Sequence, residues 1–162
     1  MIPSLQPGDE EPSGGEMKRI RDLTLLRQQL RALVEEMKRF LQASEAPGIP
    51  DEVRLTLLFS VAEIASAIVI AVSSERKLRA ILCKMRSSRR VNRALAILRR
   101  DGVISHEDYE RLRRVLRALR CHRNAYLHPI CVERCPPLSV DEARRCVEEL
   151  AALALRYASR ED

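Results

Sequence analysis

The chain has little of what a β-sheet protein needs. It contains two phenylalanines, no tryptophan and only five glycines among 162 residues, whereas leucine, alanine, arginine and glutamate are abundant. Strands are enriched in aromatic residues, and the tight turns between them often need glycine. We therefore expect an all-α protein, and a hydrophobic content of 46% suffices for one core.

Lysine is scarce as well, with 4 lysines against 25 arginines, and there are two asparagines. We take this composition to indicate a GC-rich and thermophilic source. The N-terminus lacks the basic stretch followed by an apolar run that marks a signal peptide. We therefore expect a cytoplasmic protein.

The motifs of the common catalytic classes are missing. The sequence has no glycine-rich phosphate loop, no H-E-x-x-H zinc motif, no serine nucleophile elbow and no paired-carboxylate motif. We predict no cofactor and no metal site.

The predicted organisation is one helical domain behind a short tail. Residues 1–16 hold three prolines, three glycines and four acidic residues without periodicity, so a disordered acidic tail is expected. Residues 17–162 are predicted to form a four-helix-bundle-like core with an extra short helix. The expected helices span 17–46, 51–74 and 89–100, then run from a capping box at Ser105 to about His128, and finally from a second capping box at Ser139.

Apolar residues recur at helical spacing in these segments. The first helix has Leu23, Leu26, Leu30, Leu33, Met37 and Phe40; the last has Val140, Ala143, Val147, Leu150, Ala154 and Tyr157. Both stripes are expected to face the core.

The second helix is the most apolar part of the chain. Residues 55–72 carry one charge, Glu63, and are long enough for a membrane span. A carboxylate in mid-membrane is costly, so we favour a helix buried within the bundle and predict no membrane association. Glu63 then needs a partner, and Arg123 is the first candidate.

Positive charge is concentrated between residues 75 and 123. This stretch has sixteen Lys and Arg residues against five acids, a net +11, while the whole chain is +6. Many such runs are solvated faces with Arg stems covering apolar surface. We interpret this one as a surface for a polyanion, with Arg113, Arg117 and Arg120 as RNA-binding candidates.

Residues 123–129 read Arg-Asn-Ala-Tyr-Leu-His-Pro and are the strongest candidate site. Asn124 and His128, four residues apart, share one helix face. His128 precedes a proline, which disfavours the α conformation, so the helix should end there. The apolar stripe Leu112, Leu116, Leu119 continues onto Arg123 and then Tyr126. An arginine on a buried stripe should be paired or should line a cleft.

Arg-Asn-x-x-x-His, after a basic amphipathic helix and before a loop and an acidic-starting helix, resembles the HEPN superfamily over roughly residues 95–158. That superfamily comprises small all-helical ribonucleases and toxins with an Arg-x(4–6)-His motif. The resemblance implies a metal-independent endoribonuclease that acts as a toxin or defence factor, in which Arg123, Asn124 and His128 are catalytic, with Glu63 and Tyr126 supporting. It also implies a homodimer and a nucleotidyltransferase-like antitoxin as partner.

Two alternatives stay open. The chain could be a non-catalytic HEPN-like module that binds nucleotide or RNA or serves in assembly, with Arg123 and His128 structural. A third reading is a purely structural helical scaffold or a membrane-associated protein.

The cysteines near the motif also allow several states. We expect free or packed thiols, while a disulfide from Cys131 to Cys135 or to Cys146 and a zinc site remain alternatives. Zinc ligands would be His128, Cys131 and Cys135 with Cys121, His122 or Cys146, but the spacing lacks a paired C-x2-C knuckle.

Overall fold

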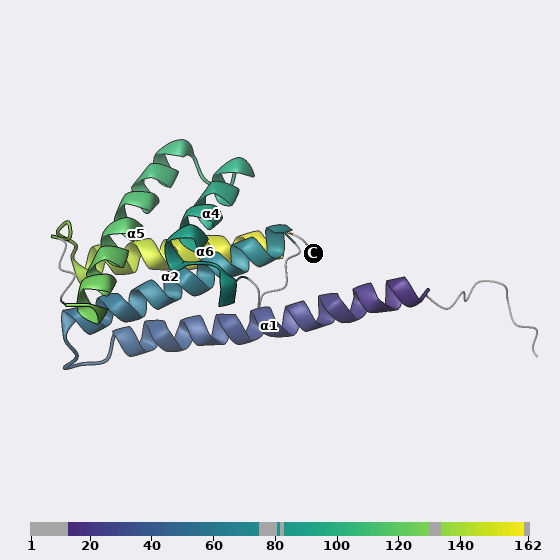
Figure 1. Cartoon of the computed structure of the whole chain (residues 1–162), viewed down its shortest axis with the longest axis horizontal. Helices are drawn as coiled ribbons and strands as arrows, with labels where there is room; N and C mark the ends of the chain where they lie inside the picture. The colour runs from purple at the N-terminus through teal and green to yellow at the C-terminus, as the bar shows by residue number, and fades with distance from the viewer. Residues whose placement is uncertain (1–12, 75–80, 82, 130–133, 161–162) are drawn as a thin grey trace, which may run out of the picture.

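The computed structural model describes residues 13–74, 81, 83–129 and 134–160. Within these ranges the chain forms five helices and no strand, so the predicted all-α class is confirmed (Figure 1). The helices are α1 (Gly14–Ser44), α2 (Asp51–Ser74), α4 (Ser87–Arg100), α5 (His106–Leu127) and α6 (Val140–Ser159).

Helix α2 is the centre of the bundle and contacts each of the other four helices. Its residues from Leu58 to Ala71 are largely inaccessible to solvent, and Phe59, Ile68 and Ile70 are among the largest fully buried side chains. The helix is long and apolar enough to cross a membrane, yet 67% of its most apolar window is buried inside the bundle. This burial matches the core helix of a soluble protein, as expected from mid-helix Glu63.

Helix α1 packs against α2 along its second half and extends beyond the bundle along its first half, drawn in purple in Figure 1. The predicted stripe is therefore only partly correct. Met37 is buried and Leu26, Leu30, Leu33 and Phe40 pack against the core, but Leu23 is exposed. The same spacing continues past the point where α1 has a partner.

Serine side chains start three helices. Ser105 Oγ accepts a hydrogen bond from the Asp108 amide and Ser139 Oγ from the Glu142 amide, both at 3.1 Å, so both serines are N-caps as the predicted capping boxes require. Ser13 Oγ likewise accepts from the Glu16 amide at 3.4 Å.

The start of α1 corrects the predicted boundary of the tail. We expected residues 1–16 to lack structure, but the helix begins at Gly14. Ser-Gly-Gly-Glu at 13–16 has the spacing of a capping box. Its two glycines and the preceding proline are typical of a disordered segment, so the sequence did not predict a helix start there. The rest of the predicted tail, residues 1–12, lies outside the described residues.

Candidate active site

Arg123 is held by helix α2. Its Nη1 donates a hydrogen bond to Glu63 Oε1 at 3.3 Å, and its guanidinium carbon lies 4.6 Å from the centre of the Phe59 ring. Phe59 and Glu63 are one helical turn apart, so one face of α2 supplies both a carboxylate and an aromatic ring. The predicted pairing of Glu63 with Arg123 is confirmed.

Glu63 also faces a second cation that the sequence did not single out. Arg90 Nη1 of α4 lies 3.9 Å from Glu63 Oε2, and Arg90 Nη2 donates to the Met85 carbonyl at 2.9 Å. The side chains of Arg90, Arg123 and Glu63 are 9%, 19% and 21% exposed. Glu63 thus contacts two guanidinium groups, one from α4 and one from α5. The sequence does not distinguish Arg90 from Arg86, Arg89 and Arg93, which stand close to it.

His128 ends helix α5 as predicted. Its backbone amide donates to the Asn124 carbonyl at 2.8 Å, and its φ of −132° and ψ of 70° lie outside the helical region. The ring is exposed to solvent. Between Arg123, Asn124 and His128, all of which the structure describes, no side-chain hydrogen bond is formed.

Tyr126 differs from the prediction. The stripe Leu112, Leu116 and Leu119 is buried and leads to partly buried Arg123, but Tyr126 is 48% exposed and neighbouring Leu127 is 50% exposed. The last turn of α5 has no cover on this side within the described chain. Tyr126 therefore does not continue the core, and an apolar surface flanks His128 instead.

One face of α5 connects the predicted RNA-binding arginines with the motif. At about 100° per residue, Arg113, Arg117, Arg120 and Asn124 fall within roughly 60° of each other on an ideal helix, and His128 follows at the end of the helix. Arg117 and His128 are exposed, and Arg113, Arg120 and Asn124 are partly exposed. Basic groups therefore lead along this face to the exposed histidine.

An open groove of about 430 Å³ lies beside this basic face. It runs between α5 and the chain that enters α6. Its lining residues are Glu110, Arg113, Arg114, Val115, Arg117, Ala118, Pro136, Pro137, Leu138 and Glu142. Two of the predicted RNA-binding residues, Arg113 and Arg117, thus share a concave surface with Arg114, whereas Arg120 lies outside it.

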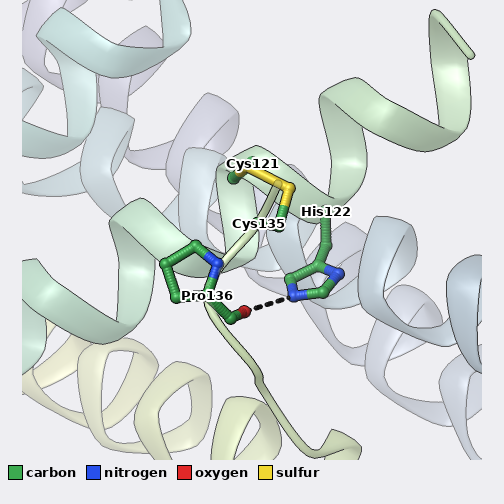
Figure 2. The surroundings of a disulfide bond; sticks show 4 residues. All are labelled: Cys121, His122, Cys135 and Pro136. Carbon is green, nitrogen blue, oxygen red and sulfur yellow. Dashed lines mark hydrogen bonds between the residues drawn. A yellow bond between two sulfur atoms is a disulfide. The ribbon is translucent and has the colours of Figure 1, made fainter. Parts of the chain in front are cut away.

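A disulfide joins Cys121 of α5 to Cys135, with their Cα atoms 5.6 Å apart (Figure 2). His122, the next residue, places Nε2 2.7 Å from the Pro136 carbonyl oxygen. Because a carbonyl only accepts, Nε2 must carry the proton. A covalent bond from Cys121 and a hydrogen bond from the adjacent His122 therefore connect α5 to the segment before α6.

The cysteine interpretation was wrong at two positions. We expected free or packed thiols, and the alternative was a disulfide from Cys131 to Cys135 or to Cys146, whereas Cys135 is bonded to Cys121. Cys131 lies outside the described residues. Cys146 is a free, buried thiol, and burial raises its pKa to about 12. A zinc site using the thiolates of both Cys121 and Cys135 would require the disulfide to be broken.

No family model matches the chain, and comparison with curated proteins and with solved structures found no significant match. The candidate functions are therefore distinguished by the chemistry of the described side chains alone.

Proposed function

We propose that the protein is a HEPN-like endoribonuclease that cleaves RNA without a metal ion, and that it acts as a toxin or defence factor. The observation that supports this most directly is the α5 face that leads from a basic groove to His128. An exposed histidine at a helix end and, five residues earlier, an arginine paired with Glu63 place an imidazole and a planar positive fork in one short segment.

The reaction is attack of a ribose 2′-OH on the adjacent phosphate. The 2′-oxygen forms a bond to phosphorus, the bond to the 5′-oxygen of the next nucleotide breaks, and a 2′,3′-cyclic phosphate and a 5′-OH result. His128 takes or gives the proton in this exchange. Arg123 stabilises charge that develops on the phosphate oxygens, and Asn124 orients the phosphate or the histidine.

Glu63 acts here as a positioning residue. It directs one edge of the Arg123 guanidinium toward α2, and Phe59 supports the plane of the group. The Nε–H of Arg123 is buried and has no hydrogen-bond partner among the described residues. Among the described residues the guanidinium is therefore held by one hydrogen bond, and a phosphate would bind its Nη groups, because the Nε–H is buried.

The active form that we propose is a homodimer. A general base and a general acid are both needed, and each chain brings one His128 to the motif. The uncovered Tyr126 and Leu127 beside His128 give a second copy an apolar surface, and the extended first half of α1 exposes Met17, Leu23 and Leu25. Pairing across the end of α5 would bring two His128 side chains toward one RNA.

The proposed setting is the cytoplasm, where a nucleotidyltransferase-like antitoxin would restrain the enzyme. Arg113, Arg117 and Arg120 would bind phosphates of the RNA without taking part in the chemistry.

The test is cleavage of a mixed RNA pool by purified variants. His128→Ala should lower the rate at least about a hundredfold, as expected for loss of a general acid or base. It should leave thermal stability nearly unchanged, because the ring is exposed. His106→Ala is the matched control, since His106 is an exposed histidine at the other end of the same helix. Equal activity of wild type and His128→Ala would exclude the proposed role.

Arg123→Lys separates charge from geometry. The lysine keeps a cation near Glu63 but loses the planar fork, so we expect lost cleavage with a small change in stability. Arg123→Ala should also abolish cleavage. Arg123→Ala should lower the free energy of unfolding by less than is usual when a buried carboxylate loses its partner, because Arg90 still lies near Glu63.

The second candidate is a non-catalytic RNA-binding or assembly module. It is favoured by the engagement of Arg123 with Glu63 and Phe59 and by the lack of a contact between Arg123 and His128. This candidate predicts that wild type binds RNA with a strong salt dependence, never cuts it, and keeps its affinity when His128 is replaced.

A further inference from the structure

The Cys121–Cys135 disulfide encloses the whole candidate motif. Cys121 precedes Arg123 by two residues and Cys135 follows His128 by seven, so the bond closes a loop with a sequence separation of 14 around Arg123, Asn124 and His128. One end of the loop is on α5 and the other is on the chain that leads to α6. The conformation available to the chain after His128 is therefore limited by this bond.

The same bond also positions the wall of the groove. Pro136, Pro137 and Leu138 follow Cys135 directly and line the groove opposite Arg113 and Arg117. The hydrogen bond from His122 Nε2 to the Pro136 carbonyl lies next to the disulfide (Figure 2). Cys135 is thus the junction between the loop after His128 and the wall of the basic groove.

The disulfide lies outside the hydrophobic core. The core is formed by α2 with the other helices, and neither Cys121 nor Cys135 belongs to it, whereas Cys146 does. Breaking the bond would therefore remove the covalent connection between α5 and the groove wall and leave the His122–Pro136 hydrogen bond and the Leu138 contact, while the packing of α2, α5 and α6 stays in place.

Both disulfide sulfurs belong to residues that are partly exposed. A dithiol reductant can reach such a bond. Its thiolate attacks one sulfur to form a mixed disulfide, and the other cysteine leaves as a thiolate and takes a proton. The second thiol of the reductant then closes its own disulfide and releases the first cysteine. Two electrons and two protons pass to Cys121 and Cys135, and the dithiol is oxidised.

We propose that the Cys121–Cys135 bond is a redox switch for the His128 site. The oxidised chain ties the end of α5 to the groove wall formed by Pro136, Pro137 and Leu138, and reduction by a cellular dithiol loosens this connection and turns the site off. The claim that the switch regulates RNA cleavage rests on the proposed function. The claim that reduction changes the conformation around His128 does not.

The first experiment measures backbone hydrogen exchange by mass spectrometry before and after treatment with dithiothreitol. Peptides covering 122–129 and 134–139 should exchange faster after reduction. Closing a loop of this size stabilises a fold by up to roughly a hundredfold, so we expect an increase of at least about tenfold in these peptides. Peptides from 55–72 of α2 serve as the internal control and should not change.

Variants separate this bond from the other cysteines. Cys121→Ser/Cys135→Ser should exchange like the reduced wild type and should not respond to dithiothreitol. Cys83→Ser, at an exposed free thiol, should behave as wild type. Repeating the measurement in Cys131→Ser excludes alternative pairing inside the loop.

The second readout is RNA cleavage, which should fall at least about tenfold on reduction and return on reoxidation, in line with the sensitivity of catalysis to small displacements. Two results would overturn the switch: unchanged exchange around His128 after the mass shows full reduction, or faster exchange throughout α2 as well, which would make the bond a staple of the whole fold. If exchange responds as expected while the oxidised protein cuts no RNA, the proposed ribonuclease function is wrong and the redox-dependent conformation stands.

Discussion

Replacing Glu63 with glutamine tests the central ion-pair arrangement, because it removes one negative charge from between two guanidinium groups. The Nη1 atoms of Arg123 and Arg90 lie 3.3 Å and 3.9 Å from the carboxylate oxygens. At an effective dielectric constant of about 20, each such pair contributes roughly 4 kcal/mol before desolvation is subtracted. Glutamine keeps an acceptor for one hydrogen bond, but it removes the negative charge that both guanidinium groups contact.

Removing one partner of a buried pair costs about 3–5 kcal/mol. The Glu63 and Arg123 side chains are about one-fifth exposed, so water screens part of this effect. We therefore expect a loss of about 2–3 kcal/mol in the free energy of unfolding for Glu63→Gln. For a chain of this size that corresponds to a decrease of roughly 5–10 °C in Tm.

Glu149→Gln is the matched control. Glu149 makes a shorter, bidentate pair with Arg111, at 2.7 and 2.8 Å, but the two side chains are 38% and 42% exposed. Exposed pairs contribute up to about 1 kcal/mol, so this variant should lose less stability despite its better geometry. Chemical denaturation of both variants provides the measurement. A larger loss for Glu149→Gln than for Glu63→Gln would refute the conclusion that burial, rather than contact distance, decides the contribution.

Three further predictions follow from the described contacts. Ser139→Ala should lower the free energy of unfolding by about 1 kcal/mol, measured by urea denaturation, whereas Ser13→Ala should cost less because α1 extends beyond the bundle there. Arg113→Gln with Arg117→Gln should weaken RNA binding and reduce the slope of log affinity against log salt by about 1.4, that is about 0.7 for each lost phosphate contact; an unchanged slope in a filter-binding titration would exclude these contacts. Because burial raises the pKa of the Cys146 thiol to about 12, iodoacetamide at pH 8 should leave it unmodified in the folded protein and label it after denaturation; labelling at equal rates in both states would contradict its burial.

The parts of the structure that the sequence predicted correctly are those determined by local patterns. The caps at Ser105 and Ser139 depend on residues three positions apart, and the end of α5 depends on the proline that follows His128. The pairing of Glu63 with Arg123 was accessible by a different route. A lone acid in an apolar helix and a lone base on an apolar stripe both require a partner of opposite charge.

The remaining features depend on where distant segments meet. Cys121 and Cys135 are brought together by the return of the chain toward α6, which no local pattern specifies. Tyr126 continues the spacing of a buried stripe, but none of the five described helices covers the last turn of α5 on that side. Periodicity shows which residues share a helix face, whereas the tertiary arrangement decides whether another element packs against that face.

The measurement that tests the proposed function most directly is the chemistry of the RNA ends after incubation with oxidised wild-type protein in excess EDTA. We predict products with a 2′,3′-cyclic phosphate and a 5′-OH, formed by wild type and His106→Ala at similar rates and absent for His128→Ala. Intact RNA at protein concentrations where the chain is dimeric, products with a 5′-phosphate, or cleavage that stops when EDTA is added would each contradict a metal-independent reaction at His128.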